Sequence, residues 1–193
     1  MTTIAKLKSA LSGGGARPNL FEVIITLPSK TQKFIFNQKE QDALSSLTPF
    51  LIKATSLPAE NIGVVEVPFR GRAFKVSGDR TVDNWSCTFI NDDQFDVHKL
   101  MHKWSEALHG NTTGMSKKID PAKYMGNAQV TQLSRGKGKK NTRGLFVWEL
   151  IDIWPVSVGA IDLSMDSTDS IEEFTVEFAI QSFKAHKKVK VTP

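Results

Sequence analysis

The sequence predicts a mainly β fold in which two packed antiparallel sheets, arranged as a sandwich or an open barrel, carry one flanking amphipathic α-helix. Three observations support this prediction. Short runs of alternating apolar and polar residues recur along the chain and are separated by turn-forming residues. One segment alone has the apolar spacing of a long amphipathic helix. The 193 residues suit a single core, and no linker or repeat of fixed period divides them.

The first fifteen residues predict an N-terminal arm. Ile4, Leu7 and Leu11 share one face of a short helix, which the glycines at 13–15 end. A helix this short is marginal by itself in water. We therefore expect an arm that requires a partner surface.

The first half of the chain then predicts a series of strands. The expected strand segments are 19–27, 33–36, 50–57, 62–69, 72–76 and 85–90. A hairpin around Gly71 joins the fourth and fifth segments, and 77–85 is expected to supply a turn. Residues 38–48 are polar and weakly helical, which is typical of a surface excursion.

The amphipathic helix is predicted over residues 93–109. Its apolar residues are Val97, Leu100, Met101, Trp104 and Leu108. A loop follows at 110–125, and the expected strands after it are 127–133, 144–154, 160–165 and 171–183. Pro155 is expected to end the second of these strands. In the last strand Glu173 and Glu177 lie on the polar face, opposite a row of apolar residues.

The positive charge of the chain is concentrated in two short segments. Lysine and arginine number 25 against 20 aspartates and glutamates, which gives a net charge of +5. The run 135–143 holds five basic residues and the segment 184–190 holds four, and neither holds an acid. The remaining 16 basic and 20 acidic residues give a net charge of −4. This composition argues against a basic nucleic-acid-binding body.

The candidate metal-binding residues fit ordinary structural roles better than a metal site. His98 and His102 lie four residues apart on one helical face, but no third ligand and no metalloprotease glutamate accompany them. Asp162, Asp166 and Asp169 lack the spacing, the glycine and the glutamate of an EF-hand loop. We expect no metal site.

No catalytic motif is present either. The chain has no G-x-S-x-G segment and no P-loop. Its single cysteine, Cys87, excludes an internal disulfide, fits a reducing compartment and is expected to be buried. No apolar run approaches the 18 or so residues of a membrane span, so we expect no membrane insertion by the protein itself. The sequence predicts a protein that is not an enzyme and binds no cofactor.

The basic run 135–143 permits two interpretations. Its basic residues are Arg135, Lys137, Lys139, Lys140 and Arg143. Predicted strands flank the run and it contains no aromatic residue, so a solvated hairpin connection is favoured. The alternative is a nucleic-acid-binding module that uses this run together with the basic segment 184–190.

Three segments of the chain resemble the tail tube proteins of T4-like contractile-tailed phages. They are ARPNLFEV at 16–23, SGDRTVDNWSCTFINDD at 77–93 and IWPVSVGAIDLSMDSTDSIEEFTVEFAI at 153–180. They occur in the same order as in that family. The resemblance implies a tail-tube β domain at 16–183, between an N-terminal arm at 1–15 and a basic tail at 184–193. It also marks 38–48 as an insertion.

The resemblance implies a structural virion protein. In this family six subunits close into a ring whose inward strands form a β-barrel, and stacked rings form the inner tail tube through which DNA passes. The implied partners are further copies of the chain, the tail sheath protein, a tape-measure protein and a baseplate tube-initiator protein. The implied location is the virion tail, with assembly in the host cytoplasm. The tube-initiator itself shares the fold and is the alternative within this class.

The residue roles that we expect follow from this reading. Ile4, Leu7 and Leu11 are expected to contact a neighbouring subunit. The basic run 135–143 is expected at a ring-to-ring or sheath contact, because a positively charged channel wall would retain DNA. Glu173 and Glu177 are expected to face the lumen.

Overall fold

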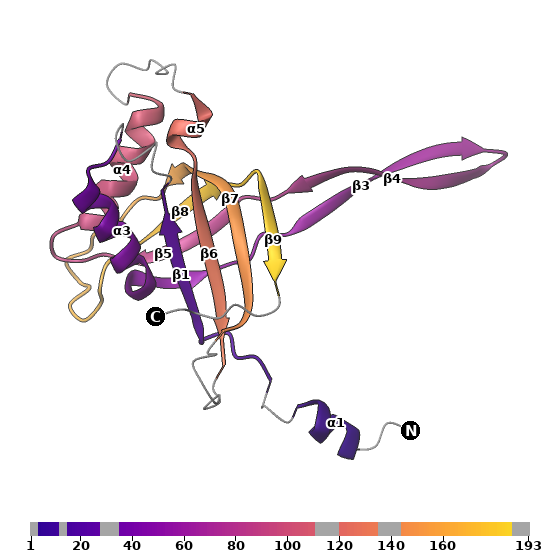
Figure 1. The fold of residues 1–193 in the computed structure, drawn as a ribbon, viewed down its shortest axis with the longest axis horizontal. Coiled ribbons are helices and arrows are strands. Elements are labelled where there is room, and N and C mark those ends of the chain that lie inside the picture. Colours follow the sequence, from indigo (N-terminus) through magenta and orange to yellow (C-terminus); the bar gives the residue numbers. More distant parts are fainter. Residues whose placement is uncertain (1–3, 12–14, 28–34, 111–119, 135–143, 187–193) are drawn as a thin grey trace.

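The computed structural model describes residues 4–11, 15–27, 35–110, 120–134 and 144–186. Seven of its strands form one antiparallel sheet in the order β1-β6-β7-β8-β5-β2, with β9 also paired to β7, and two form a separate hairpin (Figure 1). The strands are β1 (Phe21–Thr26), β2 (Ile52–Thr55), β3 (Glu60–Phe69), β4 (Arg72–Val82), β5 (Trp85–Ile90), β6 (Gly126–Leu133), β7 (Gly144–Val158), β8 (Glu173–Ala179) and β9 (Ser182–His186). The helices are α1 (Ile4–Ala10), α3 (Gln38–Leu51), α4 (Asp96–Leu108) and α5 (Pro121–Tyr124).

Strand β7 divides the large sheet into two sheets. Its first part pairs with β6 and β9, whereas its end, from Trp154 onward, pairs with β8. Between these parts Asp152 has a φ of 56°, and its N–H donates a hydrogen bond to Asn127 Oδ1 at 3.2 Å. A left-handed residue of this kind turns the strand from one sheet into the other. We call β1, β6, β9 and the start of β7 the first sheet, and β2, β5, β8 and the end of β7 the second sheet.

Alternating side chains from both sheets meet in one hydrophobic core, so the predicted mainly β fold with two antiparallel sheets is confirmed. In the second sheet the buried residues of β5 and β8 are Trp85, Cys87, Phe89, Phe174, Val176 and Phe178. Phe89 stacks on its cross-strand partner Phe174 with ring centroids 5.4 Å apart, and Trp85 lies 5.2 Å from Phe178. Such aromatic pairs stabilise a sheet beyond the area that they bury.

Helix α4 confirms the predicted amphipathic helix, although it begins at Asp96 rather than at residue 93. The carboxylate of Asp92 accepts a hydrogen bond from the Asp96 N–H at 3.0 Å and so satisfies one free donor at the helix start. The apolar face of α4 packs into the core. Trp104 on this face is fully buried, and its indole N–H donates to the Tyr124 carbonyl at 2.9 Å.

Residues 38–48, predicted as a surface excursion, instead form most of helix α3, which packs on β1. Gln41 Nε2 donates to the Leu27 carbonyl at 2.7 Å. Thr48 Oγ1 accepts from the Ile25 N–H at 3.5 Å. These side chains satisfy backbone groups along the edge of β1 that faces away from β6. These polar residues of α3 are therefore buried because their side chains form hydrogen bonds with the backbone at the edge of the sheet.

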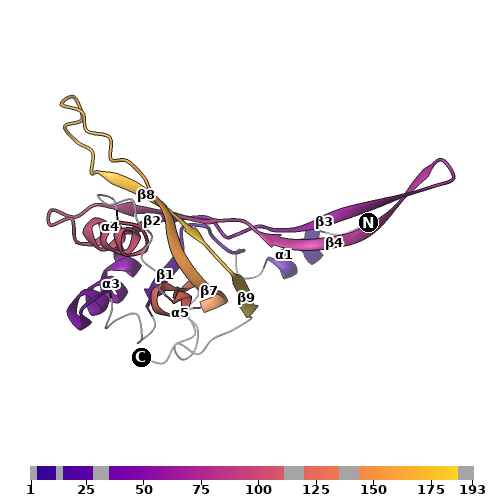
Figure 2. The same ribbon diagram turned by 90° about the horizontal axis from the view of Figure 1, so that it is seen from above.

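Helices α3 and α4 lie together on one side of the molecule (Figure 2). Lys103 of α4 donates to both carboxylate oxygens of Glu40 at 2.7 Å. This hydrogen bond from Lys103 holds the pKa of Glu40 below its ordinary value. The described fold thus has two helices against its core, where the sequence predicted one.

One predicted strand end and one predicted strand at the C-terminal side are wrong. Pro155 lies buried within β7, which continues to Val158 instead of ending. The ladder with β8 shifts register between Pro155 and Ser157, so the missing N–H falls at an irregular position. Residues 160–165 form no strand and belong to the loop between β7 and β8.

Two predictions in the first half also need correction. Ile35 and Phe36, the described part of the predicted strand 33–36, are not in a strand but are buried in the core. The turn expected within 77–85 is confined to Asp83 and Asn84, because β4 extends to Val82. No helix in the described ranges is long and apolar enough to cross a membrane.

Candidate assembly surfaces

The hairpin β3–β4 projects from the body on the side opposite α3 and α4 (Figures 1 and 2). Arg70 and Gly71 form its turn with φ values of 46° and 78°, the left-handed backbone that two-residue hairpin turns require. The hairpin predicted around Gly71 is confirmed. Its strands are longer than predicted, because the ladder runs back to Glu60 and Val82.

One face of this hairpin is apolar and uncovered. Its side chains, each between 43% and 66% exposed, are Val65, Val67, Phe69, Phe74 and Val76. We call these five residues the hairpin patch. The opposite face is mixed, because it carries Val64 and Pro68 together with an ion pair between Lys75 Nζ and Glu66 Oε1 at 3.2 Å. A two-stranded hairpin is marginal by itself in water, and a contiguous apolar patch marks an interaction surface.

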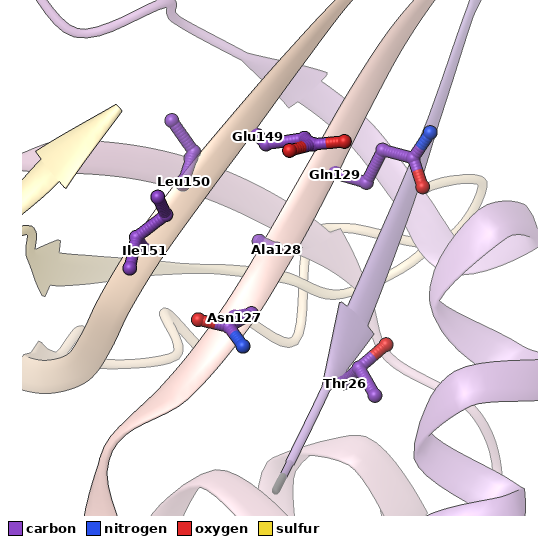
Figure 3. A pocket seen from close by; sticks show the side chains of 7 residues that line it. All are labelled: Thr26, Asn127, Ala128, Gln129, Glu149, Leu150 and Ile151. Atoms are coloured by element: carbon purple, nitrogen blue, oxygen red, sulfur yellow. The ribbon is translucent and has the colours of Figure 1, made fainter. Parts of the chain in front are cut away.

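An open groove lies on the outer face of the first sheet, near the bend of β7 (Figure 3). It encloses about 360 Å³ and is lined by Thr26, Asn127, Ala128, Gln129, Glu149, Leu150 and Ile151. Gln129 and Glu149 are cross-strand partners, and Glu149 Oε2 lies 3.6 Å from His186 Nε2. The mostly polar lining suits a hydrated surface rather than an enclosed ligand site.

The outer face of the second sheet carries the two glutamates that we expect to face the lumen. Glu173 and Glu177 are exposed on β8, as the alternation predicts. Glu173 forms an ion pair with Lys53 of β2. Between the two acids, the hydroxyl oxygens of Thr175 and Thr88 lie 3.2 Å apart. This face is polar and uncovered in the single chain, and its relation to a lumen stays a prediction.

The two candidate metal clusters of the sequence are not assembled. Among the described residues, no group of three or more histidine, cysteine, aspartate or glutamate side chains could hold a metal ion. Asp162, Asp166 and Asp169 are exposed along the β7–β8 loop. His98 packs edge-on against Phe174 and His102, at centroid distances of 4.9 and 4.6 Å. Burial, followed by the nearby His102, lowers the pKa of His98.

Cys87 is fully buried in β5, where its sulfur lies 3.2 Å from the Thr55 hydroxyl oxygen. Burial raises the pKa of its thiol to about 12. Because the thiolate is the reactive form, we expect native protein at pH 8 to resist a thiol reagent such as Ellman's reagent. Urea-unfolded protein should react stoichiometrically, and an unassembled Leu7→Cys variant should gain one fast-reacting thiol. Stoichiometric labelling of the native wild-type chain would contradict the burial of Cys87.

Comparison with known proteins identifies the family of this chain. Residues 16–186 match the family described as phage tail tube protein. Tail tube protein gp19 of Enterobacteria phage T4 is 34% identical over 171 residues, which cover 88% of this chain and 91% of that protein. The chain belongs to the phage tail tube protein family. A tail tube protein of Serratia phage KSP90 is 26% identical over 179 residues, which cover 92% of this chain and 93% of that protein.

Solved structures share the fold of this tail tube family member at low sequence identity. A chain of the anti-feeding prophage baseplate, a six-fold symmetrised structure, superposes with a TM-score of 0.58 at 13% identity and covers 90% of this chain and 96% of its own length. A chain of the PVC sheath–tube complex in its extended state gives a TM-score of 0.57 at 11% identity, with coverage of 93% and 97%. Family membership shows a structural component of a phage tail tube, not an enzyme.

The structure describes only some of the residues that we expect to contact other subunits of the tail tube. Ile4, Leu7 and Leu11 lie on or just after α1 and are 73%, 60% and 52% exposed. The basic run 135–143 lies outside the described residues, as does most of the basic tail. Lys184 of that tail is described, and it lies exposed on β9.

The sequence reading missed the hairpin patch as a candidate surface of this tail tube family member. Its signal was present in the segment IGVVEVPF at 62–69, where apolar residues follow one another instead of alternating strictly. We interpreted that run and the segment 72–76 as the two strands of an ordinary hairpin, not as an interaction surface. Apart from Val82 at the base of β4, which packs against the core, the strands leave the body and pair only with each other in the described structure.

Proposed function

We propose that this protein closes into rings of six subunits that stack into the inner tube of a contractile phage tail, through which DNA passes. The observation that carries the proposal is the hairpin patch. A structural subunit that projects an apolar hairpin from one side, while its body lies on the other, is suited to a heterologous contact with a second copy. Repetition of such a contact yields a closed ring or an open filament.

The ring number and the partners are part of this proposal. The anti-feeding prophage baseplate, which contains a chain of the same fold, is a six-fold symmetrised structure, and the PVC chain of this fold occurs in a sheath–tube complex. By analogy we assign to this protein six-fold rings and contacts with a sheath protein, a tape-measure protein and a baseplate tube-initiator. We also place its assembly in the host cytoplasm.

We further propose that the outer face of the second sheet lines the lumen. Glu173 and Glu177 are exposed on this face, and Lys53 pairs with only one of them. The face therefore presents no excess of positive charge to the phosphates of passing DNA. A channel wall of this kind gives DNA little to bind, which suits a conduit that its cargo must leave.

Imaging of the purified protein tests the proposal. The protein should form rings or hollow tubes as its concentration is raised, visible by negative-stain electron microscopy and by sedimentation velocity. Symmetry determination by cryo-electron microscopy should give six subunits in each ring, with Glu173 and Glu177 toward the lumen. A protein that stays monomeric at all concentrations and salt conditions would contradict the proposed assembly.

A further inference from the structure

We propose that helix α1 of one subunit docks on the β7–β8 loop, residues 159–172, of a neighbouring copy. This contact rests on the proposed self-assembly and adds to it a specific pair of surfaces. Both surfaces are apolar and uncovered in the single chain. They differ in charge, because α1 is basic and the loop is acidic.

The helix presents an apolar stripe with a positive flank. Ile4, Leu7 and Leu11 recur at the spacing of one helical face and are all more than half exposed. Lys8, four residues after Ile4, borders this stripe, whereas Lys6 lies on the other side of the helix. A helix of this length gains its stability from the surface that covers its apolar side.

The loop presents apolar side chains among acids. Leu163, Met165 and Ile171 are 78%, 101% and 70% exposed, which is unusual for three large apolar residues in one loop. The segment 159–172 contains four acids and no lysine or arginine. Its exposed aspartates are Asp162, Asp166 and Asp169.

The end of this loop is held in place by the body of the protein. The Asn91 N–H donates to the Glu172 carbonyl at 2.9 Å, and Asn91 Nδ2 donates to the Glu172 carboxylate at 3.1 Å. At the tip, the Ser167 N–H donates to the Ser164 carbonyl at 3.2 Å and forms a turn. The apolar residues are therefore presented by an ordered loop, which lowers the entropy cost of binding.

Charge selects this loop over the other uncovered apolar surface. The hairpin patch is bordered by Arg70 and Arg72 at the tip of the hairpin, which would repel Lys8. The aspartates of the loop would attract it. Within one chain, α1 and the loop lie well apart in both views, with the strands of the body between them (Figures 1 and 2). The contact must therefore form between copies.

Disulfide trapping in the assembled protein tests this contact. A tagged Leu7→Cys chain and an untagged Met165→Cys chain are mixed, assembled and oxidised, and tag-dependent heterodimers are measured on a non-reducing gel. Cys87 is buried and should not contribute. We expect efficient crosslinking for Leu7→Cys and at most a minor band for Lys6→Cys, which lies on the other side of α1. Equal crosslinking of these two positions would overturn the inference.

Charge reversal supplies an independent readout. Lys8→Glu should lower the yield of the Leu7–Met165 crosslink roughly fivefold, and Asp166→Lys in the partner chain should restore it, whereas Lys6→Glu should change it little. Far-UV circular dichroism checks that each variant is folded. Rings or tubes that assemble without the crosslink overturn this contact and leave the proposed function standing. Chains that never assemble overturn both.

Discussion

The double variant Val67→Glu/Phe74→Glu is expected to remain a folded monomer that no longer forms rings or tubes. The two residues are direct cross-strand partners at the centre of the hairpin patch and are 47% and 66% exposed. Fully burying an exposed side chain of this kind contributes about 1.5–3 kcal/mol, and covering these half-exposed residues contributes about half of that each. The two carboxylates of the variant would also have to be desolvated. Sedimentation velocity and negative-stain microscopy should show the loss of assembly.

A swap on the other face of the same hairpin is the matched control. Glu66→Lys/Lys75→Glu keeps an ion pair on the face opposite the hairpin patch and leaves the patch itself intact. It should assemble as the wild type does. The thermal unfolding of the Val67/Phe74 variant as a monomer should stay close to that of the unassembled wild-type chain, because both side chains lie on the surface. Wild-type assembly by the double glutamate variant would show that the patch is not a subunit contact.

The elements that the sequence predicts well are those in which local pattern and tertiary environment agree. The alternation in 85–90 and 173–179 matches the buried faces of β5 and β8. The apolar spacing of 97–104 matches the core side of α4. In each case one face is buried and the other is exposed, so periodicity alone reveals the element. The tail tube family was recognised separately, from the resemblance of three quoted segments, two of which contain these strands.

The failures lie where tertiary contacts override the local pattern. No single-residue preference indicates that Asp152 adopts a left-handed backbone and transfers β7 between two sheets, because asparagine and glycine favour that conformation more strongly. Residues 160–165 alternate like a strand, yet no neighbouring strand pairs with them. Alternation reports which side chains could be buried together, not whether a partner strand exists.

The candidate surfaces were harder to predict than the fold. Gln41 and Thr48 are polar, so the sequence suggested that α3 lies on the surface. In the structure both are buried, and their side chains form hydrogen bonds with backbone groups at the edge of β1. The hairpin patch looked like core sequence, because an apolar surface that awaits a second copy has the same composition as a core. The sequence alone does not distinguish apolar residues of a core from those of a subunit contact. The structure distinguishes them by their solvent exposure.

The variant Trp104→Ala is expected to lower the free energy of unfolding by about 3–5 kcal/mol. Trp104 is fully buried, and it joins α4 to three other parts of the fold. Its ring lies edge-on to Phe36 at 6.3 Å and 6.1 Å from Phe178 of β8, and its indole N–H bonds to Tyr124 of α5. Truncation leaves a cavity between these elements and a carbonyl without its donor.

Urea unfolding followed by far-UV circular dichroism measures this loss. It should be performed in the Val67→Glu/Phe74→Glu background, because assembly stabilises the native state by mass action and would mask the effect. Trp104→Phe keeps an aromatic ring but removes the N–H donor, so it should cost less than Trp104→Ala. Phe50→Ala, at an 82% exposed position of α3, should change the stability by no more than about 0.5 kcal/mol. Similar losses for Trp104→Ala and Phe50→Ala would show that Trp104 does not anchor the core, since burial is what separates the two aromatic residues.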